Sequence, residues 1–178
     1  MTSKQNPVLA PFQAKKHDHG ACINDAIKMA EEICGRDGTA LTELRRRVLE
    51  LVWEGHRPVR AYDLLKKLQQ DRSKAAPPTV YRALDFLMEN GLIHKIESLN
   101  AFVGCGAPAQ RHGGQFLICR DCGAVAELND LAVERRIAVK AADLGFKVES
   151  QMIEVLGTCP DCSMSGKDTL DACCTPPH

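Results

Sequence analysis

This 178-residue sequence lacks a net charge, a long apolar run and a hydrophobic leader. A membrane-spanning helix needs about 20 mainly apolar residues, and no run in the sequence approaches that length. The N-terminus also lacks the apolar core of a signal peptide. We therefore expect a protein without a membrane segment, located in the cytoplasm, where thiols stay reduced.

The balanced net charge conceals a difference between the two halves of the chain. Residues 1–104 carry 16 Lys/Arg and 13 Asp/Glu, whereas residues 105–178 carry 7 and 10. The excess of three positive charges lies in the first half, and it would hold DNA only weakly through counterion release. If that half binds DNA, we expect a homodimer that presents two basic faces.

Cysteine, in contrast, is plentiful, with nine residues. Four of them form two Cys-x-x-Cys pairs, Cys119 with Cys122 and Cys159 with Cys162, and 37 positions separate the pairs. Four thiolates can supply the closed tetrahedral shell of a structural zinc site. Disulfides are the alternative interpretation, which a reducing compartment disfavours. We expect a strand–helix–strand unit between the pairs, so that the metal would join the ends of a small domain.

Hydrophobic periodicity predicts that the first half of the chain is helical. Thr42 is a suitable N-cap, and Gly91 is a natural helix stop. Two short strands follow and are expected to form a β-hairpin, the wing of a winged helix-turn-helix domain. The expected helices span 23–34, 42–53, 61–70 and 78–90, and the expected wing strands span 92–97 and 101–104.

The residue pattern of the second half predicts a smaller domain that contains the cysteine pairs. We expect strands at 115–118, 124–128 and 147–156, with a helix at about 131–144. The fold class is therefore α+β. The expected organisation is a flexible tail (1–20), a winged-helix DNA-binding domain (21–104), a Gly- and Pro-rich hinge (105–114), a zinc-binding domain (115–162) and a C-terminal tail (163–178).

The fourth predicted helix is the candidate DNA-reading element. Its apolar residues form one stripe, which we assign to the core. The other faces carry polar side chains, including a guanidinium that can pair with guanine. A tyrosine at the start of the third helix can reach phosphates or thymine methyl groups. The alternative is that these side chains lie on an ordinary solvent-exposed helix surface and do not contact DNA. The candidate DNA-binding residues are Tyr62, Thr79, Tyr81 and Arg82.

A second metal site is predicted around the hinge. Two imidazoles, a thiolate and a carboxylate would satisfy the preference of zinc for nitrogen and sulfur ligands, and the thiolate disfavours magnesium and calcium. The residues come from both halves, so binding would couple to their relative orientation, as a sensor requires. Each residue alone has a non-metal explanation. The four candidates are His94, Cys105, His112 and Glu127.

The sequence resembles the ferric uptake regulator (Fur) family. The resemblance runs from about Cys22 to Cys162, and it depends on Thr-Val-Tyr-Arg (79–82) and both cysteine pairs at family spacing. Within the family the chain is similar to the zinc-uptake branch, because His94-Lys-Ile-Glu-Ser98 and the second ligand set match that branch. Iron-sensing relatives carry a His-His-x-His run before the first pair, whereas this chain has the single His112 there.

The resemblance implies a homodimeric repressor that binds a near-palindromic DNA operator when zinc is bound, and that represses zinc-uptake genes. It also implies that residues 115–162 form the dimerisation domain and that each chain holds two zinc ions, one structural and one regulatory. The alternative within the family is a sensor of iron(II), manganese(II) or peroxide.

Two other functions have less support in the sequence. An enzyme with catalytic zinc is disfavoured, since such zinc keeps an open position and usually has three protein ligands. A metallochaperone would use ligands in the tails, which we expect to be solvated, and it would not need a winged helix. The ligands of a metallochaperone would be Cys173, Cys174 and His178, and the sequence does not determine whether these or the N-terminal His17 and His19 bind metal.

Overall fold

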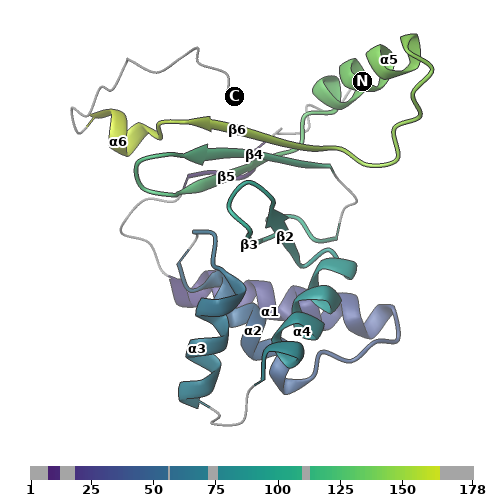
Figure 1. The fold of residues 1–178 in the computed structure, drawn as a ribbon. Coiled ribbons are helices and arrows are strands. Elements are labelled where there is room, and N and C mark those ends of the chain that lie inside the picture. The colour runs from purple at the N-terminus through teal and green to yellow at the C-terminus, as the bar shows by residue number, and fades with distance from the viewer. Residues whose placement is uncertain (1–7, 13–18, 56, 72–75, 110–112, 165–178) are drawn as a thin grey trace.

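The structure, a computed structural model, describes residues 8–12, 19–55, 57–71, 76–109 and 113–164. It confirms the α+β prediction, with helices in the first half of the chain and a mixed sheet in the second (Figure 1). The helices of the first half are α1 (His19–Arg36), α2 (Glu43–Trp53), α3 (Ala61–Asp71) and α4 (Pro77–Glu89). None of the described helices is both long enough and apolar enough to cross a membrane.

Local signals in the sequence explain where these helices begin and end. Thr42 caps α2, and its side-chain oxygen accepts a hydrogen bond from the backbone N–H of Arg45. Two prolines occupy the first turn of α4, where the missing N–H groups cost nothing. Gly91 has a φ of 65°, which lets the chain leave α4 and enter the wing. The apolar sides of the four helices pack into one core with Leu92, Ile93 and Phe102.

The wing is an antiparallel hairpin of β2 (Ile93–Ile96) and β3 (Ala101–Gly104). Val59, in front of α3, exchanges two backbone hydrogen bonds with Phe102 of β3, so the helical core holds one side of the hairpin. The other side packs on the sheet of the second half through Ile96 and Val103. The wing therefore lies between the two halves of the molecule (Figure 1).

A four-stranded sheet forms the second half, in the order β1–β5–β4–β6. Its strands are β1 (Val8–Ala10), β4 (Gly114–Cys119), β5 (Val125–Leu128) and β6 (Met152–Gly157), and helix α5 (Leu131–Asp143) connects β5 to β6. Strands β4 and β6 are parallel, whereas β5 is antiparallel to β4 and to β1. A short helix, α6 (Pro160–Met164), follows β6.

The structure differs from the sequence-based expectations in three places. Part of the expected flexible tail is ordered, because Val8–Ala10 pairs with the open edge of β5 and α1 already begins at His19. Strand β6 begins at Met152 rather than at residue 147, because its partner β4 offers only six residues for pairing. Helix α6 was not expected, and its backbone closes around the second cysteine pair.

Gly104, the last residue of β3, allows the wing to lie close to α2. A Cβ atom at this position would lie 2.1 Å from Cε2 of Trp53. We expect Gly104→Ala to destabilise the protein by about 1–3 kcal/mol, because overpacking forces the indole ring or β3 to move. Gly35→Ala is the control: in α1 its Cβ meets nothing within 4 Å. It should stabilise the helix by about 0.5–1 kcal/mol. Thermal unfolding of both variants checks this prediction, which equal midpoints would contradict.

Candidate functional site

The four cysteines of the two Cys-x-x-Cys pairs meet at one end of the sheet. Strands β4 and β6 are parallel neighbours in register, with Cys119 opposite Gly157, so their carboxyl ends place both pairs together. The four sulfur atoms all lie within 4.8 Å of one another. Gly123, with a φ of 71°, closes the tight turn after the first pair. All cysteines in the described part of the chain are free thiols, so the disulfide alternative has no support there.

The geometry of this thiol cluster fits a tetrahedral metal. Zinc–sulfur bonds of about 2.3 Å require sulfur atoms roughly 3.8 Å apart. The sulfur atoms of Cys122 and Cys159 are 3.7 Å apart. The backbone N–H of Cys159 also donates a hydrogen bond to the sulfur of Cys119 at 3.3 Å, which supports negative charge on that sulfur.

The thiols of the cluster differ in acidity. Burial raises the pKa of Cys119, but backbone N–H groups of Cys159, Cys122 and Asp121 outweigh it and lower the pKa to about 6. The pKa of Cys162 is raised to about 12, chiefly by the neighbouring Cys159. Four thiolates at this spacing repel one another, so the cluster needs a cation to ionise fully.

A second cluster joins the wing to the sheet. His94 lies on β2, Cys105 follows β3 and Glu127 lies on β5, and their ligand atoms lie within 4.8 Å of one another. Nε2 of His94 is 2.8 Å from Oε1 of Glu127, and the sulfur of Cys105 is 3.9 Å from the same oxygen. The structure thus brings together three of the four residues predicted for the second metal site. His112 lies outside the described residues.

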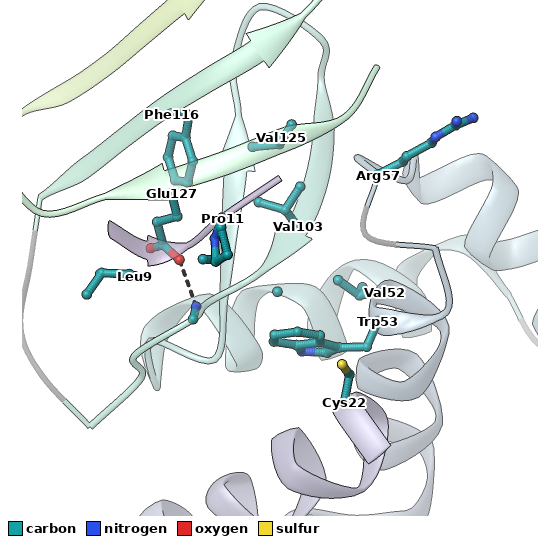
Figure 2. Close-up of a pocket in the computed structure, with 13 residues that line it drawn as sticks. Leu9, Pro11, Cys22, Val52, Trp53, Arg57, Val103, Phe116, Val125 and Glu127 are labelled. Atoms are coloured by element: carbon teal, nitrogen blue, oxygen red, sulfur yellow. Dashed lines mark hydrogen bonds between the residues drawn. The ribbon is translucent and has the colours of Figure 1, made fainter. Parts of the chain in front are cut away.

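Strand β1 lies beside this second cluster, because it pairs with β5 and places Ala10 opposite Glu127. The backbone N–H of Gly106 donates a hydrogen bond to Oε2 of Glu127 at 2.7 Å, drawn as the dashed line in Figure 2. A Cβ at Gly106 would lie 2.9 Å from the carbonyl oxygen of Leu9, so only glycine lets β1 approach this closely. As a result Glu127 is only 2% exposed.

The electrostatics of the second cluster favour a cation. Burial lowers the pKa of His94, but Cys105 and Glu127 outweigh it and raise the pKa to about 9. In the absence of metal, His94 therefore carries a proton that compensates the buried Glu127 carboxylate. A divalent ion that binds the same nitrogen, sulfur and oxygen must displace this proton, and this donor set suits zinc.

The candidate DNA-reading residues form an exposed surface on α3 and α4. Tyr62 is 64% exposed and Tyr81 is 54% exposed, although both are large aromatic residues. Thr79 and Arg82 are exposed on the N-terminal half of α4, whose opposite side is buried in the core. The ammonium group of Lys66 lies 4.5 Å from the centre of the Tyr62 ring and adds positive charge to this surface.

A further apolar surface lies on α5 and β6. Helix α5 has no buried residue and projects away from the sheet (Figure 1). Large apolar side chains on and beside these two elements are exposed, as is typical of a surface that another subunit covers. The exposed residues are Leu131, Val133, Ile137, Val139, Leu144, Phe146, Met152, Val155 and Leu156.

Two residues beside these sites escaped the sequence analysis. Gly106 contributes through its backbone N–H, which no sequence pattern identifies. Glu154 is the only charged residue within β6, and its carboxylate contacts the turn of the wing. Glu154 could have been noticed in the sequence, because it is a single charged residue in the otherwise apolar segment Met152–Gly157.

Comparison with known proteins identifies the family. The model of the ferric uptake regulator family matches residues 36–156. The chain belongs to this family. It is 41% identical to the zinc uptake regulation protein of Escherichia coli K12 over 139 residues, which cover 78% of this chain and 81% of that protein. Its identity to the ferric uptake regulation protein of the same organism is 30% over 141 residues, 78% of this chain and 88% of that protein.

A solved structure gives the same result for the fold. A zinc uptake regulator complexed with zinc and DNA matches with a TM-score of 0.77 and 40% identity, over 80% of this chain and 96% of that one. The family and its zinc-uptake branch, both predicted from the sequence, are thus confirmed. Members of the family are transcription regulators rather than enzymes.

Proposed function

We propose that this protein is a homodimeric, zinc-responsive transcriptional repressor that acts in the cytoplasm and silences zinc-uptake genes. The observation that carries the proposal is the cluster of His94, Cys105 and Glu127 between the wing and the sheet. A ligand controls DNA affinity only if it binds one arrangement of the two halves better than another. A metal held by this cluster does so, because its ligands come from both halves.

Each chain holds two zinc ions in this proposal. Cys119, Cys122, Cys159 and Cys162 bind the structural ion and stabilise the dimerisation domain, 115–162. His94, Cys105 and Glu127, with His112 as the fourth ligand, bind the regulatory ion. Bound zinc would supply the positive charge that offsets the Glu127 carboxylate and the Cys105 thiolate, and these residues would hold it between the wing and the sheet.

The dimer reads DNA through α4. The apolar surface of α5 and β6 pairs with its copy, so the two α4 helices are related by a two-fold axis and match a near-palindromic operator. Arg82 contacts a base or phosphate, and Thr79, Tyr81 and Tyr62 contact the adjacent backbone or thymine methyl groups. Without the regulatory metal, the two winged helices leave the spacing that fits successive major grooves.

Binding to a duplex from the promoter of a zinc-uptake operon tests the proposal, with free zinc, iron(II) and manganese(II) each buffered separately. We expect tight binding at trace free zinc and none with the other two ions at comparable free concentrations. Fluorescence anisotropy measures it. A response to iron(II), manganese(II) or peroxide instead would keep the repressor and replace its signal. Failure with every metal, repeated with a random-duplex selection, would contradict the repressor itself.

Arg82→Ala tests the DNA surface. It should weaken DNA binding by the zinc-loaded dimer by about 1–3 kcal/mol, the range for a lost bidentate contact. Arg120→Ala removes another exposed arginine, which lies between Cys119 and Cys122 rather than on α4, and is the control, provided that its zinc content is unchanged. The same anisotropy titration measures both variants. Equal affinities would show that α4 does not read the operator through Arg82.

A further inference from the structure

The wing hairpin contacts the sheet of the second half at both of its ends. At its open end, His94 and Cys105 lie against Glu127 of β5. At its closed end, the turn between β2 and β3 lies against Glu154 of β6. Between these two points, apolar side chains of the wing pack on β4 and its neighbours, in a cluster of Ile96, Leu99, Val103, Phe116, Ile118 and Val125.

The contact at the closed end is made by one carboxylate and two consecutive backbone groups. Oε1 of Glu154 accepts a hydrogen bond from the N–H of Glu97 at 2.7 Å, and Oε2 accepts one from the N–H of Ser98 at 3.2 Å. Hydrogen bonds to an ionised carboxylate are stronger than neutral ones. Because both donors belong to the main chain, the contact fixes the turn itself, independently of the side chains at 97 and 98.

The orientation of the wing determines that of α4. Only three residues separate the end of α4 from β2, and the N–H of Leu92 donates to the carbonyl oxygen of Leu87 at 2.8 Å. This short connection and its hydrogen bond couple the direction of the hairpin to that of α4. Each attachment to the sheet restricts the directions in which the wing can turn, and the apolar cluster between the two ends is not directional, so the polar contact at the closed end adds a restraint that the other contacts do not supply.

We propose that Glu154 is a positioning residue that holds the wing turn on the dimerisation sheet and so sets the direction of α4 in the DNA-binding form. The inference rests on the proposed function for its consequence on DNA, but not for the contact itself. The cluster at the open end is the proposed regulatory metal site, whereas the Glu154 contact has no metal ligand in it. In the zinc-loaded dimer the two attachments act together.

Two substitutions at Glu154 and one control test the proposal in the full-length protein. Glu154→Ala removes both acceptors, and Glu154→Gln keeps a single acceptor oxygen. Glu149→Gln removes the same charge from an exposed position in front of β6 and is the matched control. Zinc content and thermal midpoint are measured first, and we expect all variants to match the unsubstituted protein.

Amide hydrogen exchange of the wing turn reports the contact directly. We expect exchange of the peptide that contains Glu97 and Ser98 to be about tenfold faster in Glu154→Ala. Operator affinity of the zinc-loaded dimer should fall by about tenfold in the same variant, while its affinity for zinc changes little. Glu154→Gln should show a smaller effect in both measurements, and Glu149→Gln should show none.

The two readouts separate this proposal from the function on which it rests. Unchanged exchange in Glu154→Ala would overturn the contact, and faster exchange with unchanged operator affinity would overturn the positioning role. If the unsubstituted protein bound no operator with any metal, the proposed function would fail. Small-angle scattering of the zinc-loaded dimers would then decide the positioning role, since a released wing broadens the distance distribution and an identical curve contradicts the proposal.

Discussion

Cys105→Ser is expected to abolish zinc-stimulated operator binding while the protein stays folded and dimeric. The serine hydroxyl does not ionise at neutral pH, so the cluster with His94 and Glu127 loses its thiolate ligand. Loss of a partner outside the ligand shell already costs about 10–100-fold in metal affinity, and loss of a ligand should cost more. The substitution nearly preserves volume at a site that is 2% exposed, so the core and the four-cysteine cluster should tolerate it.

Two measurements on Cys105→Ser separate sensing from folding. Native mass spectrometry should find one zinc per chain instead of two, and anisotropy should find operator affinity independent of free zinc. Cys22→Ser is the matched control, because Cys22 is a half-buried free thiol in α1 that belongs to neither cluster. It should keep the full zinc response. A normal zinc response in Cys105→Ser would refute the regulatory role of this cluster.

The sequence predicted the features that local chemistry determines. The cap at Thr42, the prolines that open α4 and the glycine at 91 act within a few residues, and the helices lie within a few residues of their predicted bounds. The four cysteines were also predicted as one cluster, because their spacing matches the chemistry of a single ion. The structure places their sulfur atoms within 4.8 Å of one another, and their role as zinc ligands stays a prediction.

Features that depend on distant partners could not be predicted. Val8–Ala10 looks like a tail between prolines, and it forms a strand only because the edge of β5 is open beside it. The length of β6 is set by β4, more than 30 residues earlier in the chain. The carboxylate of Glu154 binds backbone groups 56 and 57 positions away, and backbone donors leave no trace in a sequence.

The second metal cluster could be predicted only in part. Its residues were predicted because His, Cys and Glu are the side chains that zinc prefers, and three of them do meet. Their high burial was not predicted. For Glu127 it arises because β1 pairs with β5 beside this residue, and that pairing joins segments more than 100 residues apart in the chain.

Cys119→Ser is expected to have the larger structural effect. Cys119 ends β4 and is 1% exposed, and its sulfur accepts the backbone N–H of Cys159, so it joins the two ends of the dimerisation domain. Structural zinc contributes about 10–16 kcal/mol of apparent binding energy in small zinc domains. A whole domain has a net stability of only about 5–15 kcal/mol. Loss of one thiolate should therefore unfold the sheet or separate the subunits.

Sedimentation and hydrogen exchange distinguish these outcomes for Cys119→Ser. The variant should sediment as a monomer or aggregate, and β4 and β6 should lose protection while α1 to α4 keep theirs, because the helical core is a separate apolar cluster. Cys34→Ser is the control: Cys34 is equally buried, at 2% exposed, but lies in that helical core. It should lower the stability of the helices and leave the dimer and its zinc intact. A well-folded Cys119→Ser dimer without zinc at the four-cysteine site would show that metal does not hold this domain together, and the apolar packing of β4 would then have to do so alone.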